Sequence, residues 1–122
     1  MSNTLISVKN LSVDYITDTI PIRAVRDVSF EISSGEIFGL VGESGSGKST
    51  VVQAMMRILA PPAIISGGKV IINSENIMTA TESDIIRFRW KRISIVMQSA
   101  LNALNPVLSV REQIHDVLKT HK

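Results

Sequence analysis

The sequence predicts an α/β fold in which an antiparallel β element precedes a buried strand, a glycine-rich loop and a helix. Residues 5–15 and 25–32 are rich in β-forming residues, and they lie ahead of the continuously apolar residues 37–41. Apolar residues recur with helical spacing over residues 49–59, and the loop 42–50 joins the apolar strand to this helix. The chain has 122 residues, 44% of them hydrophobic, which is typical of one globular domain.

Composition excludes several classes of function. The net charge is +2, from 13 basic and 11 acidic residues, so we expect no general attraction to nucleic acid or anionic lipid. The chain has no cysteine, which excludes a disulfide scaffold, a thiolate zinc site and a cysteine nucleophile. No apolar run approaches the roughly 18 residues of a membrane-spanning helix, and the first residues lack the features of a signal peptide. We therefore expect a cytoplasmic protein.

The first part of the chain is expected to form the antiparallel element. Residues 5–15 predict one or two short strands, and residues 16–22, which contain Thr, Asp and Pro, predict a turn or an exposed loop. Apolar and polar residues alternate over residues 25–32, which indicates a half-solvated antiparallel strand. Residues 37–41 are apolar throughout, and this pattern predicts a strand that is buried on both faces.

Five elements are predicted after the loop, each from its apolar spacing and its boundary signals. They are a helix over residues 49–59, a strand over residues 69–72, a short helix over residues 81–90, a strand over residues 92–97 and a helix from Ser109 onward. The first helix should end before the prolines that follow it, because proline interrupts a helix. The two later helices each begin with a capping-box pattern, in which a hydroxyl residue is followed three positions later by an acid.

The loop carries the clearest chemical signal in the sequence. It reads Gly42-Glu43-Ser44-Gly45-Ser46-Gly47-Lys48-Ser49-Thr50 and matches the P-loop pattern G-x-x-x-x-G-K-[ST]. Glycines allow the backbone N–H groups to converge on a phosphate, and the helix that begins near Lys48 adds its own N–H groups and dipole. Lys48 would neutralise the β and γ phosphates, and Ser49 would offer a hydroxyl to Mg²⁺. The alternative is a strand-to-helix turn with an incidental lysine, and the position of the loop favours nucleotide binding.

A family resemblance extends this interpretation. In chain order, VDYIT, AVRDVSFEISSGEIFGLVGESGSGKST, GGKVIIN and ISIVMQSALNALNPVLSVREQI resemble the start of an ATP-binding-cassette (ABC) transporter nucleotide-binding subunit, above all of the dipeptide and oligopeptide branch. The resemblance covers essentially the whole chain. It implies that residues 1–122 are the N-terminal half of one P-loop NTPase domain of the ABC type. Residues 1–35 would form the antiparallel element, and residues 36–122 would form part of the P-loop core, up to and past the glutamine loop.

The same resemblance gives two further residues a role. Tyr15 matches the aromatic residue on which adenine stacks in this family, although a lone tyrosine beside a strand is more often a packing residue. Gln98 matches the family's glutamine that reaches Mg²⁺ or the attacking water, although an isolated glutamine after a strand is usually an ordinary loop residue. The resemblance thus implies Lys48 and Gln98 as catalytic residues, and Ser49 and Gln98 as Mg²⁺ contacts.

The function that the resemblance implies is ATP binding and hydrolysis coupled to the import of peptides or similar small solutes. ATP and Mg²⁺ would be the cofactors. The partners would be a second ATPase subunit and transmembrane permease subunits, and no nucleic acid is expected. The subunit would lie on the cytoplasmic face of the cell membrane. The family's signature motif, Walker B carboxylates and switch histidine do not occur in these residues, so we expect no hydrolysis by this chain alone. Two alternatives are an ABC-type ATPase of a DNA-related or soluble complex, and a non-catalytic nucleotide-binding fragment.

Overall fold

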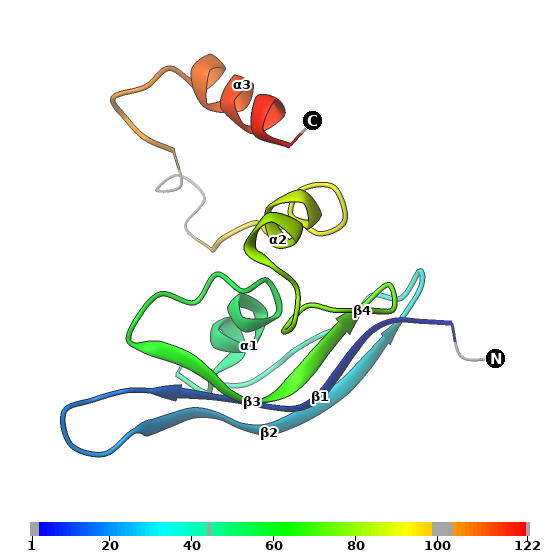
Figure 1. The fold of residues 1–122 in the computed structure, drawn as a ribbon, viewed down its shortest axis with the longest axis vertical. Coiled ribbons are helices and arrows are strands. Elements are labelled where there is room, and N and C mark those ends of the chain that lie inside the picture. Colours follow the sequence, from blue (N-terminus) through cyan, green and yellow to red (C-terminus); the bar gives the residue numbers. More distant parts are fainter. Residues whose placement is uncertain (1–2, 44, 99–103, 122) are drawn as a thin grey trace. The chain divides into compact units, whose positions relative to one another are not determined.

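The computed structural model describes residues 3–43, 45–98 and 104–121, which form two compact units, Met1–Ala80 and Thr81–Lys122. The elements, in chain order, are β1 (Thr4–Tyr15), β2 (Ile22–Ser33), α1 (Lys48–Met55), β3 (Ala63–Ile72), β4 (Glu75–Asn76), α2 (Glu82–Phe88) and α3 (Val110–Thr120) (Figure 1). Most of the predicted site residues belong to the first unit. Among the described residues, no helix is long and apolar enough to cross a membrane.

The first unit is built on a four-stranded antiparallel sheet with the strand order β2-β1-β3-β4. The central strand, β1, supplies Val8, Leu11 and Val13 to the core, and each of these side chains is almost fully buried. Burial of such a side chain stabilises a fold by about 1.5–3 kcal/mol. The helix α1 lies on one face of this sheet and packs against β1 and β2 (Figure 1). The predicted antiparallel element is therefore confirmed, with one long first strand.

The second strand shows the predicted alternation. Val28, Phe30 and Ile32 are half-buried, whereas Ser29 and Glu31 are exposed. Because successive side chains of a strand point to opposite faces, one face of β2 is partly covered and the other is solvated. This alternation arises from the strand itself, which explains why it could be predicted from the sequence.

Residues 37–41 form no strand, and this corrects the predicted buried strand. Ile37 is 100% exposed and Val41 is 93% exposed. A strand needs neighbours that accept and donate its backbone hydrogen bonds, and no described segment pairs with these residues. Phe38 does find a partner, since its ring stacks on Phe30 with the ring centroids 5.0 Å apart. The apolar run is thus present without the paired neighbours that would make it a strand.

The predicted strand over residues 92–97 is wrong for the same reason. Within the second unit these residues make only an isolated parallel bridge, between Arg89 and Ile93. Val96 and Met97 are exposed. One bridge leaves most backbone groups of the segment without ladder partners, and the segment is therefore irregular.

The helix α1 ends at Met55, four residues before the predicted end at residue 59. Arg57 adopts a left-handed conformation with φ of 53°. Its guanidinium donates hydrogen bonds to the carbonyl oxygens of Ile77, at 3.1 Å, and Ala80, at 2.6 Å. These bonds hold the chain in a conformation that interrupts the helix before the prolines can. The following strand, β3, correspondingly begins earlier than predicted, at Ala63.

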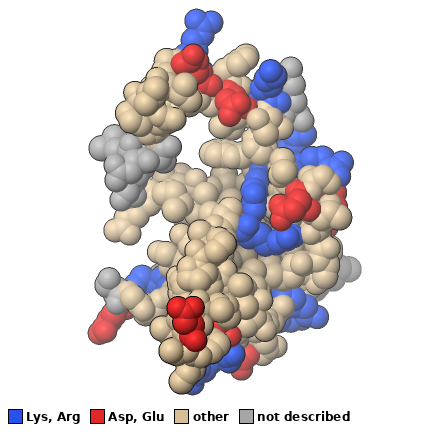
Figure 2. Space-filling view, turned by 60° about the vertical axis from the view of Figure 1, so that its left-hand side comes forward, with Lys and Arg blue, Asp and Glu red and all other residues tan. Residues whose placement is uncertain are grey.

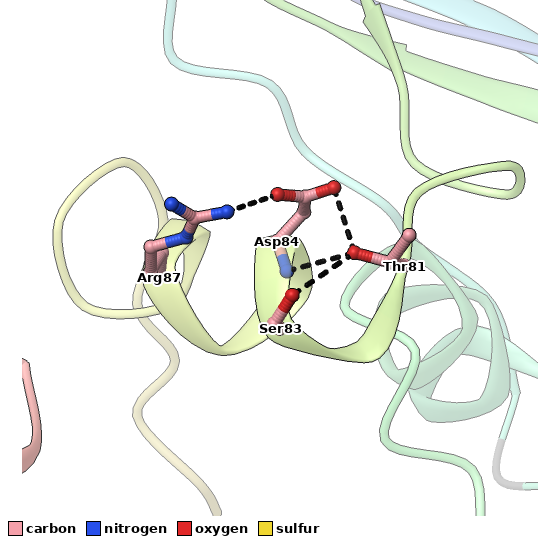
Figure 3. A network of polar contacts seen from close by, with 4 residues as sticks. All are labelled: Thr81, Ser83, Asp84 and Arg87. Atoms are coloured by element: carbon pink, nitrogen blue, oxygen red, sulfur yellow. Dashed lines mark hydrogen bonds and ion pairs between the residues drawn. The ribbon is translucent and has the colours of Figure 1, made fainter.

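The helix α2 begins where the sequence predicted. The Thr81 hydroxyl accepts a hydrogen bond from the backbone N–H of Asp84 and donates one to its carboxylate, and Ser83 and Arg87 complete the network (Figure 3). The hydrogen bond from Thr81 is the main reason that the pKa of Asp84 is lowered, and Arg87 lowers it further. An N-terminal threonine with acids in the first turn satisfies the free N–H groups and the helix dipole together.

The helix α3 carries a complete capping box. The Ser109 hydroxyl accepts from the backbone N–H of Glu112, and the Glu112 carboxylate accepts from the backbone N–H of Ser109 at 2.8 Å. Val110, Ile114 and Leu118 form the predicted apolar stripe, and all three are exposed. The start of the helix and its amphipathic pattern are confirmed, because both depend on local interactions.

Candidate functional site

The glycine-rich loop packs against β2 through one of its glycines. Gly47 is the N-cap of α1 and adopts a left-handed conformation with φ of 98°. A Cβ atom at this position would lie 2.9 Å from the carbonyl oxygen of Ala24 and 3.4 Å from a methyl group of Val25. Only glycine satisfies both the backbone conformation and this close approach. The contact places the start of α1 directly against the second strand.

The ammonium group of Lys48 lies inside the curve of the loop. Lys48 is the first residue of α1, and its Nζ atom donates to the carbonyl oxygens of Gly42 and, at 2.7 Å, of Glu43. The Ser46 hydroxyl lies 3.5 Å from the same nitrogen. The loop is therefore wrapped around a full positive charge. The loop is narrow between Gly42 and Ser46, because a Cβ atom on Gly42 would lie 2.6 Å from the Ser46 hydroxyl oxygen.

The N-terminus of α1 adds further positive potential beside Lys48. The first-turn N–H groups, those of Lys48, Ser49 and Thr50, have no acceptor within the helix. The N-cap residue, Gly47, has no side chain that could accept from these N–H groups, and the first turn contains no acid. Free N–H groups, the positive end of the helix dipole and an ammonium group thus converge, and together they suit an anion. The Ser49 residue is exposed there, whereas Ser44 lies outside the described residues.

Tyr15 lies at the end of β1, on the face of the sheet that carries the loop. Its register partners are Ile22 on β2 and Ala63 on β3, and its side chain is half-buried. The pairing of β1 with β3 is regular from Val13 to Tyr15, so these two side chains share a face. Val13 in turn pairs with Val25, the residue beside Gly47. The structure thus brings Tyr15 and the loop onto one face of the first unit.

Gln98 belongs to the second unit, where it is an exposed residue of a turn. The residues that immediately follow it lie outside the described part of the chain. Its predicted contact with Mg²⁺ or water therefore stays a prediction.

Sequence reasoning missed an ion pair that lies next to Tyr15. Asp14 of β1 accepts hydrogen bonds from Arg23 of β2, and this interaction is the main cause of the lowered pKa of Asp14. A hydrogen bond from Ser66 lowers the pKa further. The signal that could have revealed the pair was an acid inside an apolar strand, with an arginine at the start of the next strand.

On the face drawn in Figure 2, acidic side chains lie beside several of the basic ones. On α2 itself, Arg87 forms an ion pair with Asp84. Such pairing is typical of a solvated helix face.

Comparison with known proteins identifies relatives of the whole chain. A family model described as ABC transporter matches residues 25–122. The oligopeptide transport ATP-binding protein OppD of Escherichia coli K12 is 38% identical over 121 residues, which cover 99% of this chain and 36% of that protein. The dipeptide transport ATP-binding protein DppD of Bacillus subtilis 168 is 36% identical over 119 residues, covering 97% of this chain and 36% of that protein.

A solved structure supports the same fold. It is a dimeric post-hydrolysis state of the ATP-binding cassette MJ0796 bound to ADP and Pi, with a TM-score of 0.63 and 19% identity. The similarity covers 93% of this chain and 54% of that chain, and it confirms the predicted P-loop NTPase fold of the ABC type. The chain spans about a third of the length of the curated relatives it matches. The family model includes the loop, the helix α1 and everything that follows them, and the chain therefore belongs to the ABC transporter family.

Proposed function

We propose that this chain is the N-terminal part of the ATP-binding subunit of an importer of peptides or similar small solutes. The observation that carries the proposal is the ammonium group of Lys48, which the loop surrounds at the uncapped start of α1. A triphosphate tail is the anion that such a loop binds. The peptide substrate class is suggested by the relatives, which are named as oligopeptide and dipeptide transport proteins.

In this proposal the phosphates accept hydrogen bonds from the free N–H groups at the start of α1. The Lys48 ammonium then exchanges the carbonyl oxygens of Gly42 and Glu43 for phosphate oxygens, which are stronger acceptors because they are charged. The Tyr15 ring provides a platform for adenine on the same face of the sheet. The platform and the loop therefore hold the two ends of one ATP molecule.

Mg²⁺ fits the Ser49 hydroxyl, which is exposed in the first turn of α1. Mg²⁺ takes few protein ligands and keeps several waters, so one hydroxyl beside phosphate oxygens is a sufficient protein contact. Gln98 of the second unit would add the amide oxygen that the family resemblance implies as the second Mg²⁺ contact. The bound ion would neutralise charge on the β and γ phosphates.

The proposal assigns the turnover of ATP to a larger assembly. The role of an import ATPase implies a second ATPase subunit and permease subunits in the membrane as partners. It also implies a position on the cytoplasmic face of that membrane. This chain contains no residue that matches the family's general base, so we expect it to bind ATP without hydrolysing it. Release of phosphate that needs Mg²⁺ and disappears in Lys48→Ala would contradict this expectation.

The phosphate site is tested by two lysine substitutions. Lys48→Ala should weaken the binding of a fluorescent ATP analogue in the presence of Mg²⁺ by about 10- to 100-fold, because charge-assisted hydrogen bonds are lost. Lys69→Ala is the matched control, since it removes an equal charge from an exposed position on β3. Equal affinities of Lys48→Ala and the unsubstituted chain would show that the loop is not the site.

The adenine site is tested separately through Tyr15. Tyr15→Ala should weaken ATP binding by about 1–3 kcal/mol, the range for a base stacked on an aromatic ring. Tyr15→Phe should bind nearly as well as the unsubstituted chain, since stacking needs the ring and not the hydroxyl. A phenylalanine variant as weak as the alanine variant would refute stacking.

A further inference from the structure

A forked ion pair joins the first two strands next to Tyr15. The Arg23 Nε atom lies 2.9 Å from one carboxylate oxygen of Asp14, and Nη2 lies 3.3 Å from the other. The Asp14 side chain is only 12% exposed, whereas that of Arg23 is 45% exposed. Two parallel hydrogen bonds fix the orientation of both groups, unlike a single contact between flexible side chains. The pair can therefore determine local geometry.

The ion pair lies at a break in the register between β1 and β2. Val13 pairs with Val25, but the next residue, Asp14, pairs with Arg23. Ala24 is thus an additional residue of β2, which is the arrangement of a β-bulge. The Ala24 carbonyl oxygen is also the atom closest to a Cβ placed on Gly47. The bulged residue of β2 is therefore the one that Gly47 of the phosphate loop approaches.

The same ion pair borders the position of Tyr15. Asp14 precedes Tyr15 on β1, and Arg23 follows Ile22, the register partner of Tyr15. Because side chains alternate along a strand, the Asp14 carboxylate and the Tyr15 ring lie on opposite faces of the sheet. The ion pair can thus hold the strand ends together without occupying the space beside the ring.

We propose that Asp14 and Arg23 are positioning residues of the nucleotide site, whose ion pair holds the end of β1 against β2 beyond the bulge at Ala24 and thereby sets the orientation of Tyr15. The inference rests on the proposed function, because it assumes that Tyr15 receives the base. It concerns the placement of the base and leaves the phosphate contacts to the loop itself. Loss of the ion pair should therefore weaken ligands that carry a base more than ligands that do not.

The test compares ATP with inorganic tripolyphosphate, which has the phosphates and no base. Each is titrated against the fluorescent ATP analogue bound to the chain. Arg23→Gln should weaken the binding of ATP by about 3- to 10-fold, which is a fraction of the loss expected of Tyr15→Ala. The binding of tripolyphosphate should stay unchanged. Asp14→Asn should have the same effect, and the double variant should lose little more, since both substitutions break one interaction. Arg87→Gln is the matched control, because it breaks the ion pair on α2.

A second readout needs no ligand. Tyr15 is the single tyrosine of the chain, so ring-labelled tyrosine gives NMR signals of that residue alone. Arg23→Gln and Asp14→Asn should shift these signals, whereas Arg87→Gln should not. Unshifted signals, or an unchanged affinity for ATP in both variants, would overturn the inference.

The outcomes separate this inference from the proposed function. Equal losses for ATP and tripolyphosphate would overturn the inference, since the ion pair would then act on the phosphate loop. If Lys48→Ala abolishes binding while Arg23→Gln and Asp14→Asn bind normally, the proposed function stands and the inference fails. If the unsubstituted chain binds neither ligand, both fail.

Discussion

Replacement of Gly47 by alanine tests how the phosphate loop is held against the sheet. Gly47 has a φ of 98°, and its Cβ would lie 2.9 Å from the Ala24 carbonyl oxygen. Two other glycines separate these effects. Gly45 has a φ of 81° and no atom within 4 Å of its Cβ position, whereas Gly39 has an ordinary φ and is equally open. Alanine at position 47 therefore meets both the left-handed conformation and the close contact. Alanine at position 45 meets only the left-handed conformation, and alanine at position 39 meets neither.

The expected magnitudes follow from these differences. A left-handed conformation costs a residue with a Cβ about 1–2 kcal/mol, which is the whole penalty expected of Gly45→Ala. A contact with a backbone atom cannot be relieved by rotation of a side chain, and overpacking of this kind costs about 1–3 kcal/mol more. Gly47→Ala should therefore lose about 2–5 kcal/mol of unfolding free energy. Gly39→Ala should lose none.

Urea unfolding followed by far-UV circular dichroism measures these losses as shifts of the midpoint at constant slope. The order of stability should be Gly39→Ala, then Gly45→Ala, then Gly47→Ala. Equal losses for the last two would refute the reasoning, because the Ala24 carbonyl would then place no limit on the loop. A loss in Gly39→Ala as large as in Gly47→Ala would refute it as well, because a methyl group at Gly39 meets neither a left-handed conformation nor a close contact.

Three further predictions concern the sheet and α3. Gly68→Ala should strongly lower the urea midpoint, because its Cβ would overlap the Asn10 carbonyl group at a φ of 88°, whereas Gly67→Ala should be tolerated. Ser109→Ala should destabilise α3 by about 1 kcal/mol, measured by hydrogen exchange over residues 110–120. The Ser109 backbone N–H lowers the pKa of Glu112, so this carboxylate stabilises α3 above its ordinary pKa. The hydrogen-exchange protection of α3 should therefore fall as the pH drops below about 4, and Glu112→Gln should abolish this pH dependence.

Interactions between residues close in sequence made part of the fold predictable. The starts of α2 and α3 depend on a hydroxyl and an acid three positions apart, and both were located from the sequence. The alternation along β2 and the glycine-rich loop are equally local patterns. The loop also identified its own chemistry, because the glycines and the lysine that an anion requires are adjacent in the chain.

The tertiary structure alone decided what depends on distant partners. Residues 37–41 carry the composition of a buried strand, but no described segment supplies the hydrogen-bonded neighbours that a strand requires. The end of α1 is set by bonds from Arg57 to carbonyl groups about twenty residues away, at Ile77 and Ala80. The bulge at Ala24 likewise depends on the register of two strands. The sequence by itself therefore determined the starts of α2 and α3, the alternation along β2 and the chemistry of the loop, whereas only the pairing of remote segments decided which strands form and where the loop contacts the sheet.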